Sequence, residues 1–563
     1  MTTSAIPKPQ SAILNGTGGI KREDALNLLI LTAVFAAILL LIPPQHEYPV
    51  LDDSIYADTA LTLHETGDFV MPGLNQSNLI GLILWGVLWT KTFGFSFTVL
   101  TYSTLFFAVV AILSFYGLAR AVDVPPWGAL LGSLLLAFNP LFLHLNYTFM
   151  TDVPFVALTL AACYLYLRGL QSERLALLIA GSFCAGWAFL IRQFGAFVPA
   201  AFVAYLAITG WQEKRWRWKE ALAIVAVPLL SVVGWYLYKA WQQIGPTGAE
   251  EHADRHAAAF RWKAEWVRVT GLRILSAAPL LAFFAWAAVK LRLSRWWLVP
   301  ACLAVMVGAM YLLDLPSEQW IPVTEQPYVA GIGPVQITFP QETFTFGTRG
   351  SILRVGGIDF FQYRQEPIWS PALWRGLWVV GVMLAALLLA KIISSAYDWT
   401  RGLVKRETIS PVVALYGLGF AIFLVSIAYP NEYFDRYLLG FLPFLLLFVI
   451  RGSKEWGKVA WAYSIAALVA LASFSLLLKA DHISHANARW QAAEWLAARA
   501  PGVQGGFDWD NWTKRVNLDY HISDIRHDGF RVERRFQYQS LLSGGQTRYV
   551  LAEVRNNIPP LAP

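Results

Sequence analysis

The chain has 563 residues, of which 56% are hydrophobic and only 14% are charged. A soluble domain is roughly a quarter charged, so this composition excludes an ordinary soluble globular protein. The net charge of +7 comes largely from Lys and Arg in short clusters at the ends of apolar runs. That placement fits membrane anchoring and argues against nucleic acid as a partner.

Apolar runs near the ~20-residue length that a bilayer core requires recur along the chain. They predict roughly thirteen membrane-spanning helices and an all-α polytopic membrane protein. The predicted spans are 25–43, 97–119, 127–145, 151–168, 174–191, 194–210, 219–241, 268–290, 295–314, 370–391, 410–428, 436–451 and 457–479. The run 79–93 is shorter and amphipathic, and we interpret it as an interfacial helix that lies on the membrane.

The distribution of Lys and Arg predicts the orientation of these spans. With a cytoplasmic N-terminus, the inner loops hold about twenty Lys and Arg, against about three in the short outer loops. We therefore expect a multi-pass protein of the plasma (inner) membrane and cell envelope. An odd number of spans places the C-terminal region outside the cytoplasm. The long outer segments are 44–96, 242–267 and 315–369.

The composition predicts two domains. Residues 1–479 form the transmembrane domain, and residues 480–563 carry many charges among alternating apolar residues. Within this second part, 488–502 is typical of an amphipathic helix that ends before Pro501, and 547–554 is typical of a strand. We expect a small extracytoplasmic α/β domain at the C-terminus.

The first outer segment carries two adjacent carboxylates directly after a span. Asp52 is placed to cap a short helix that begins at Asp53 and presents Tyr56 on one face. An ordinary helix cap is therefore one interpretation of Asp52. The other is functional, because ionisable groups at a membrane edge are costly and more often carry function.

A second acidic position and two arginines are predicted on the same side. Asp152 lies at the outer turn before the span 151–168, where Thr151, Asp152 and Pro154 also make a good helix start. Arg192 and Arg436 lie at outer turns as well. Each arginine can be a snorkelling side chain or the partner of a nearby acid. The functional alternative is a bidentate grip on a phosphate.

Carboxylates and arginines at the outer face fit one reaction class. A carboxylate can act as general base on an acceptor hydroxyl while cations stabilise a departing phosphate. Nucleotide sugars are made in the cytoplasm, so an outer-face enzyme needs a donor that a lipid carries. The sequence predicts a glycosyltransferase that moves a sugar from a polyprenyl-phosphate donor to a protein, lipid or glycan acceptor. The alternatives are a lipid or solute transporter (flippase), with charged or broken helices at mid-membrane, and a non-catalytic membrane scaffold.

Three motifs resemble the family 39-type glycosyltransferases of the GT-C fold, which include protein O-mannosyltransferases and the bacterial aminoarabinose transferase of lipid A. The resemblance covers most of the first 200 residues and the region near 430–450. The motifs are Asp52-Asp53 with Tyr56-Ala57, Gly67-Asp68 and Pro72; Asn139-Pro140 with Met150-Thr151-Asp152 and Pro154; and Arg436-Tyr437 followed by LLGFLPFLLL.

The resemblance implies a mannosyltransferase-like, inverting GT-C enzyme and assigns roles to matching residues. Asp52 matches the catalytic aspartate, Asp53 its acidic neighbour and Asp152 the second acidic position. The candidate substrate-binding residues are Tyr56, Arg192, Arg436 and Tyr437. His144, a lone histidine near the presumed site, is a further candidate that does not come from the resemblance. The chain departs from the family after Pro72, where GLNQSN brings no cation before Lys91. This departure leaves the source of one phosphate contact open.

Metal and cofactor sites are not favoured by the sequence. His252 and His256 lie four residues apart among acids, which suits either a helical metal site or a solvated polar loop, and we favour the loop. The resemblance implies no metal requirement. A divalent cation held by Asp52, Asp53 and Asp152, as in the related oligosaccharyltransferases, is the alternative.

Overall fold

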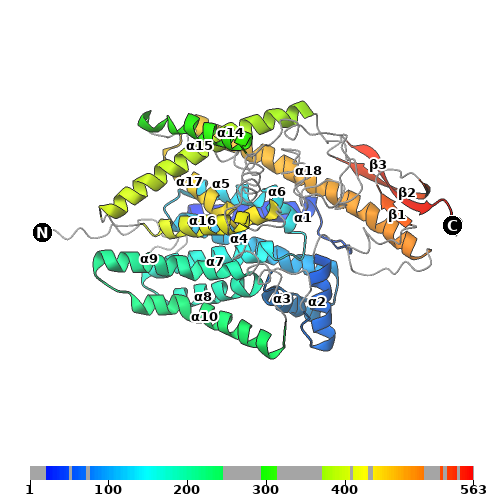
Figure 1. Ribbon diagram of the computed structural model, residues 1–563, viewed down its shortest axis with the longest axis horizontal. Coiled ribbons are helices and arrows are strands. Elements are labelled where there is room, and N and C mark those ends of the chain that lie inside the picture. The colour runs from blue at the N-terminus through cyan, green and yellow to red at the C-terminus, as the bar shows by residue number, and fades with distance from the viewer. Residues whose placement is uncertain are drawn as a thin grey trace.

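The structure is a computed structural model of the chain. It describes residues 21–49, 53–70, 77–244, 293–312, 371–405, 410–428, 435–499, 520–523, 529–541 and 545–561. Most of this part of the chain is helical, and a small sheet lies at its C-terminal end, beside the long helix α18 (Figure 1).

The helices follow one another as a bundle, in which η marks a 3₁₀ helix. Their bounds are α1 (Arg22–Leu41), α2 (Asp53–Thr66), α3 (Ile80–Phe93), α4 (Phe97–Ala121), α5 (Pro126–Ala137), α6 (Pro140–Leu145), α7 (Asp152–Ser172), α8 (Leu175–Ile191), η1 (Gln193–Ala196), α9 (Phe197–Glu213), α10 (Trp218–Trp241), η3 (Leu293–Arg295), α14 (Leu298–Leu312), α15 (Pro371–Val404), α16 (Val412–Ala428), η6 (Asp435–Gly440), α17 (Leu442–Ile450), η7 (Arg451–Glu455) and α18 (Lys458–Ala497).

Six helical segments in the described part of the chain are long and apolar enough to cross a membrane: α1, α4, α7, η1 with α9, α10 and α18. This confirms a multi-pass membrane protein. Shorter apolar helices, among them α3, α5 and α8, accompany them. The predicted span 268–290 lies outside the described residues, and the total of thirteen stays a prediction.

Two predicted spans are wrong as single helices. The span 127–145 is divided between α5 and α6, because Pro140 cannot donate a backbone hydrogen bond and Asn139 caps a new helix. The Asn139 side-chain oxygen accepts hydrogen bonds from the backbone N–H groups of Leu141 and Phe142, at 3.0 and 3.3 Å. The span 436–451 is likewise divided, between η6 and α17.

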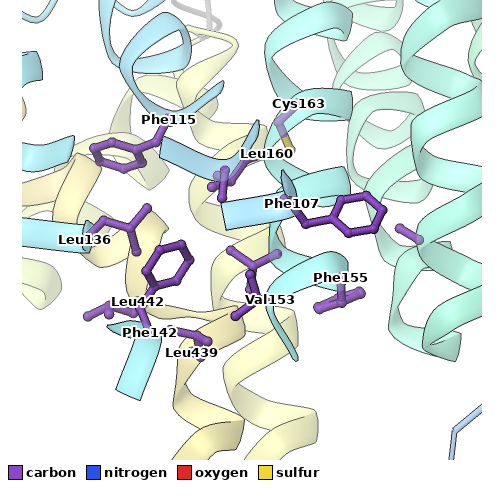
Figure 2. Close-up of a cluster of buried hydrophobic side chains, with 14 of the residues drawn as sticks. Phe107, Phe115, Leu136, Phe142, Val153, Phe155, Leu160, Cys163, Leu439 and Leu442 are labelled. Atoms are coloured by element: carbon purple, nitrogen blue, oxygen red, sulfur yellow. The ribbon is translucent and has the colours of Figure 1, made fainter. Parts of the chain in front are cut away.

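Apolar side chains from these short helices meet in the core of the bundle. Figure 2 shows Phe115 of α4, Leu136 of α5 and Phe142 of α6 close to Val153 of α7 and Leu439 of η6. All five side chains are buried. The breaks at the ends of α5 and η6 therefore lie against the beginning of α7. At that point the chain turns instead of continuing as a helix.

The C-terminal unit is confirmed as α/β, but it shares a helix with the bundle. α18 runs without a break through the predicted domain boundary at 479/480, and its last part, up to Ala497, covers most of the predicted helix 488–502. Three antiparallel strands pack on it in the order β1-β3-β2. The strands are β1 (Tyr520–Ser523), β2 (Phe530–Ser540) and β3 (Gln546–Arg555). β3 contains the predicted strand 547–554.

A buried ion pair fastens the first helix to the bundle. Arg120 Nε of α4 lies 2.7 Å from Asp24 Oδ1 of α1, and both side chains are almost fully buried. The Tyr116 hydroxyl donates a second hydrogen bond to Asp24 at 2.7 Å, and Arg120 Nη1 donates to the Val124 carbonyl at 2.6 Å. These contacts satisfy both charges inside the protein.

We expect Arg120→Met to lower the free energy of unfolding by about 3 kcal/mol, because it leaves the Asp24 carboxylate buried without its cation. The matched control is Arg217→Met, which breaks the more exposed Arg217–Glu220 pair (2.9 Å) and should cost less than about 1 kcal/mol. Unfolding of the purified protein in detergent, followed by intrinsic fluorescence, measures both. Equal losses in the two variants would contradict this account of the pair.

Candidate active site

Asp152 and Arg192, predicted separately, form an ion pair. Asp152 is the first residue of α7, and Arg192 directly follows α8. Arg192 Nη2 lies 2.9 Å from Asp152 Oδ1, with side-chain exposures of 11% and 1%. Arg192 Nε also donates a hydrogen bond to the Thr151 hydroxyl at 2.8 Å. Pairing with an acid was the structural alternative for Arg192, and the structure confirms that pairing.

The Asp152 carboxylate is buried with its hydrogen-bonding capacity largely unused. Within the described residues, neither of its oxygens accepts a hydrogen bond of good geometry, although Arg192 is close enough for charge pairing. The residue before it, Thr151, makes no side-chain cap for α7. A buried carboxylate in this condition can accept an O–H donor from a ligand.

The backbone around Arg192 is held in place by α3 and by its own turn. The Leu79 N–H donates to the Ile191 carbonyl at 3.1 Å, and the Asn78 side-chain amide donates to the Phe189 carbonyl at 2.7 Å. A Cβ atom at Gly195, in η1, would collide with backbone atoms of α8. Only a glycine lets this turn fold back so closely, and the turn fixes where the guanidinium points.

Asp53, the second acid of the first outer segment, lies at the head of α2. Asp53 begins this helix and is 1% exposed, and Tyr56 is 7% exposed one turn later. α2 packs on α3, where His64 Nδ1 lies 3.2 Å from the Thr90 hydroxyl. Asp52 lies outside the described residues, so its predicted capping and catalytic roles stay predictions.

Arg436 and Tyr437 lie on η6, at the start of the third motif. Arg436 is 6% exposed, and η6 packs against α6 and α7. A Cβ atom at Gly440, in the same turn, would lie 3.6 Å from the Phe155 ring of α7. η6 therefore lies against the first turn of α7, the turn that begins with Asp152. The side chain of Tyr437 is outside the described part of the structure.

His144 is buried, and it contacts a residue that sequence analysis missed. Its ring centroid lies 4.5 Å from that of His482 of α18, in an edge-to-face arrangement. Lys479, one turn earlier on α18, is 2% exposed, and its Nζ lies 4.8 Å from the centroid of the Tyr147 ring. The available signal was helical spacing, because Lys479, His482 and Arg489 recur at three- and seven-residue intervals.

Asp53 and Lys479 both shift pKa values in the segment that precedes α2. Burial first, and then the Lys479 ammonium, lower the pKa of His46 to about 4, so this imidazole is neutral near pH 7. Burial, and then the Asp53 carboxylate, raise the pKa of the Tyr48 hydroxyl. His46 is held by the Tyr147 carbonyl, 3.2 Å from its Nε2. Asp53 and Lys479 thus act on neighbouring residues of one segment.

The structure does not test the expectation that the protein needs no metal. Among the described residues, no group of three or more His, Cys, Asp or Glu side chains is placed to hold a metal ion. Asp52, His252 and His256 lie outside them. The cation alternative at Asp52, Asp53 and Asp152 and the expected lack of a cofactor are therefore both untested.

Residues 79–236 match the family described as dolichyl-phosphate-mannose-protein mannosyltransferase. The match contains His144, Asp152 and Arg192. No curated protein matches the chain by sequence.

Three solved membrane proteins are similar to the chain at low identity. The protein O-mannosyltransferase Pmt1–Pmt2 complex of S. cerevisiae is 15% identical, with a TM-score of 0.35, over 41% of this chain and 35% of that one. The oligosaccharyltransferase AglB of Archaeoglobus fulgidus is 14% identical (TM-score 0.42), over 86% of this chain and 58% of that one. ArnT of Cupriavidus metallidurans is 14% identical (TM-score 0.38), over 86% and 84%. The chain thus spans about a third of the length of the first protein and less than two thirds of the length of the second.

The family match contains the Asp152–Arg192 pair and most of the bundle around it, from α3 to α10. It confirms the resemblance that the motifs predicted. Over residues 79–236 the chain is thus similar to the dolichyl-phosphate-mannose-protein mannosyltransferase family.

Proposed function

We propose that the protein transfers a sugar from a polyprenyl-phosphate donor to an acceptor hydroxyl at the outer face of the membrane, with inversion at the anomeric carbon. The observation that carries this proposal is the buried Asp152–Arg192 pair, 2.9 Å apart, inside the family match. A guanidinium held at a helix end beside a carboxylate with open acceptor positions suits a substrate that brings both a phosphate and a hydroxyl.

The reaction is a single displacement. A carboxylate base, Asp52 in our proposal, takes the proton of the acceptor hydroxyl as the hydroxyl oxygen attacks the anomeric carbon. The bond between that carbon and the phosphate oxygen breaks, and both electrons of this bond leave with the polyprenyl phosphate. The new glycosidic bond forms on the opposite face of the sugar. Cations that contact the phosphate stabilise the charge that develops on it.

The pair suggests how the cationic side of the site is arranged. Thr151 and Asp152 hold two different nitrogens of Arg192, so the guanidinium is oriented before a donor arrives. We assign the phosphate contacts to Arg192 and Arg436, and the orientation of Arg192 to Asp152. Asp53 supports the base from the head of α2. Tyr56, His144 and Tyr437 are the further substrate contacts that we propose.

The placement of the site at the outer face rests on helix α9. Arg192 lies just before the helical segment that leads into α9, and the basic loop 214–219 follows its other end. At 1.5 Å per residue, α9 separates the two by about 25 Å, close to the thickness of a bilayer core. The loop also exposes Trp216 and Trp218, whose rings stack at 5.6 Å. Lys and Arg in a short loop favour the cytoplasmic side, and Trp is common at either interface, so the loop supports our proposal of Arg192 at the outer face.

Asp52→Asn should abolish most transfer while donor binding is retained, because the amide cannot accept the hydroxyl proton. Transfer from polyprenyl-phosphate sugars by purified wild-type and variant protein, with and without chelator, measures this. Sensitivity of the wild type to chelator would favour the cation alternative. Unchanged transfer in Asp52→Asn would remove Asp52 from the mechanism, and no transfer by the wild type from any donor would favour a transporter or scaffold.

Asp152→Asn and Arg192→Gln should each lower kcat/KM by at least about 100-fold, since each leaves the other partner misoriented or unpaired. We expect the double variant to lose little more than either single variant, because the two residues act as one unit. Initial rates over a range of donor concentrations give the values. Additive losses would show that the residues act independently.

Gly195→Ala should lower transfer by displacing the turn after Arg192. The added Cβ would collide with backbone atoms of α8 that cannot move aside cheaply. The matched control is Gly234→Ala in α10, where a Cβ would meet no atom within 4 Å. Rates measured beside thermal unfolding separate a local shift from general destabilisation. Full activity in Gly195→Ala would mean that this turn does not place the guanidinium.

A further inference from the structure

The C-terminal unit carries two arginines around one tryptophan, and the proposed mechanism uses none of them. Trp495 lies near the end of α18, and its ring centroid is 6.3 Å from that of Phe536 of β2. The guanidinium carbon of Arg499 lies 4.9 Å from the centroid of the Trp495 ring, and that of Arg534 lies 5.8 Å from the same ring. Two positive charges thus lie against one indole, and like charges gathered in one place disfavour each other.

An irregularity in β2 accompanies the placement of Arg534 at this cluster. β2 pairs with β3, and the register shifts between Val532 and Arg534, as in a β-bulge. Beyond the shift, Arg534 and Phe536 lie on the face of the strand toward α18, where Phe536 joins the core beneath the sheet. Arg534 also lies over the Phe536 ring, 5.3 Å from its centroid. Arg535 lies on the opposite face, so two neighbouring arginines have different surroundings.

The buried polar atoms of the cluster are donors that lack acceptors. Among the described residues, Trp495 Nε1 and Arg499 Nε are buried and have no hydrogen-bond partner. Arg499 Nη1 makes only a long contact, 3.5 Å, with the Trp495 carbonyl. An indole and a guanidinium only donate, so neither satisfies the other. Glu533 pairs with Arg531 at 2.6 Å, and in the described part of the chain no acid pairs with Arg499 or Arg534. Such donors call for an acceptor from outside.

Charge and position favour an anion from outside the membrane. β2 and β3 carry five arginines against two glutamates, so the unit attracts anions. From Lys458, where α18 begins, to Trp495 the helix rises about 55 Å at 1.5 Å per residue. A bilayer with its headgroups is about 40–45 Å thick, so a helix that begins at the cytoplasmic face, as predicted, brings Trp495 beyond the outer headgroups at a tilt of about 20°. Figure 1 shows the sheet at this end of α18.

We propose that Trp495, Arg499 and Arg534 form a binding site for a phosphate group that a ligand presents outside the membrane. A phosphate group offers several acceptor oxygens to the converging donors, and its charge of about −1.5 to −2 balances two guanidiniums better than a single carboxylate does. The site lies on α18 and β2, whereas the Asp152–Arg192 pair lies on α7 and after α8. Binding at this site requires no sugar transfer, so the inference goes beyond the proposed function.

Protection of single arginines from phenylglyoxal tests the site in the full-length protein. Purified protein in neutral detergent is modified with and without inorganic phosphate, and peptide mass spectrometry follows each arginine separately. This local readout distinguishes the site from the phosphate contacts proposed for Arg192 and Arg436. We expect phosphate at several times its Kd to slow modification of Arg534 on the order of fivefold. Arg535, on the opposite face of β2, is the matched control and should react at an unchanged rate.

Two variants show whether the three side chains act together. Arg499→Gln should remove the protection of Arg534 by phosphate, and Arg535→Gln should keep it. Arg499→Lys, which keeps the charge but loses the planar fork, replaces Arg499→Gln if thermal unfolding shows that the Gln variant does not fold, and it should weaken the protection. Full protection of Arg534 in the Arg499 variants would overturn the proposal.

Controls for salt and for lipid complete the test. No protection of Arg534, equal protection of Arg534 and Arg535, or protection that sodium chloride reproduces at equal ionic strength would each overturn the proposal. In nanodiscs without added phosphate, Arg534 should react equally fast in phosphatidylglycerol and in phosphatidylcholine. Protection by phosphatidylglycerol alone would assign the cluster to membrane headgroups and overturn the proposed ligand. All these readouts are independent of sugar transfer, so they stand apart from failure of the proposed function.

Discussion

Burial of charge is the constraint on which the arrangement of this bundle depends. Two buried ion pairs in the described part of the chain lie at opposite ends of α7. Asp152 begins this helix, and Gln171, near its end, hydrogen-bonds to Ala121, beside Arg120. The Asp24–Arg120 pair is closed by hydrogen bonds from within the protein, as a structural pair should be. The Asp152 carboxylate has its cation but no hydrogen bond of good geometry among the described residues. The Asp152 carboxylate therefore keeps acceptor positions that the Asp24 carboxylate has used.

Hydropathy predicted most helices of the bundle but not where they stop. Apolar runs identify α4, α7 and α10 because each is long and lacks an internal break other than a tolerated proline. The break before Pro140 is invisible to hydropathy, since both sides are equally apolar, although Asn139-Pro140 is a readable start signal. The sequence did not predict that α18 is continuous, because the polar residues in its second half suggested a solvent-exposed region. Packing against α6 and the sheet buries these residues.

In the candidate site, too, the sequence indicated which residues matter but not which residues they contact. Asp152 and Arg192 could be named because ionisable groups at helix ends near a membrane are rare and costly. Their pairing could not be deduced, since only the packing of α7 beside α8 brings positions so far apart in the chain into contact. Lys479 was hidden because it closes a predicted span, where a lysine is ordinary. Its surroundings are set by Ile38, Ile42, Leu143 and Tyr147, which pack against this stretch of α18.

Because α18 is continuous, the bundle and the C-terminal unit share this helix. Its first half contributes to the bundle core, Lys479 lies in the middle, and Ala488 to Leu496 form the core beneath the sheet. No flexible linker separates these parts, because one helix passes through all of them. The ring of His485 lies 4.9 Å from that of Tyr538 of β2, only two turns beyond Lys479. The sheet therefore packs on the same helix whose first half lies in the bundle core.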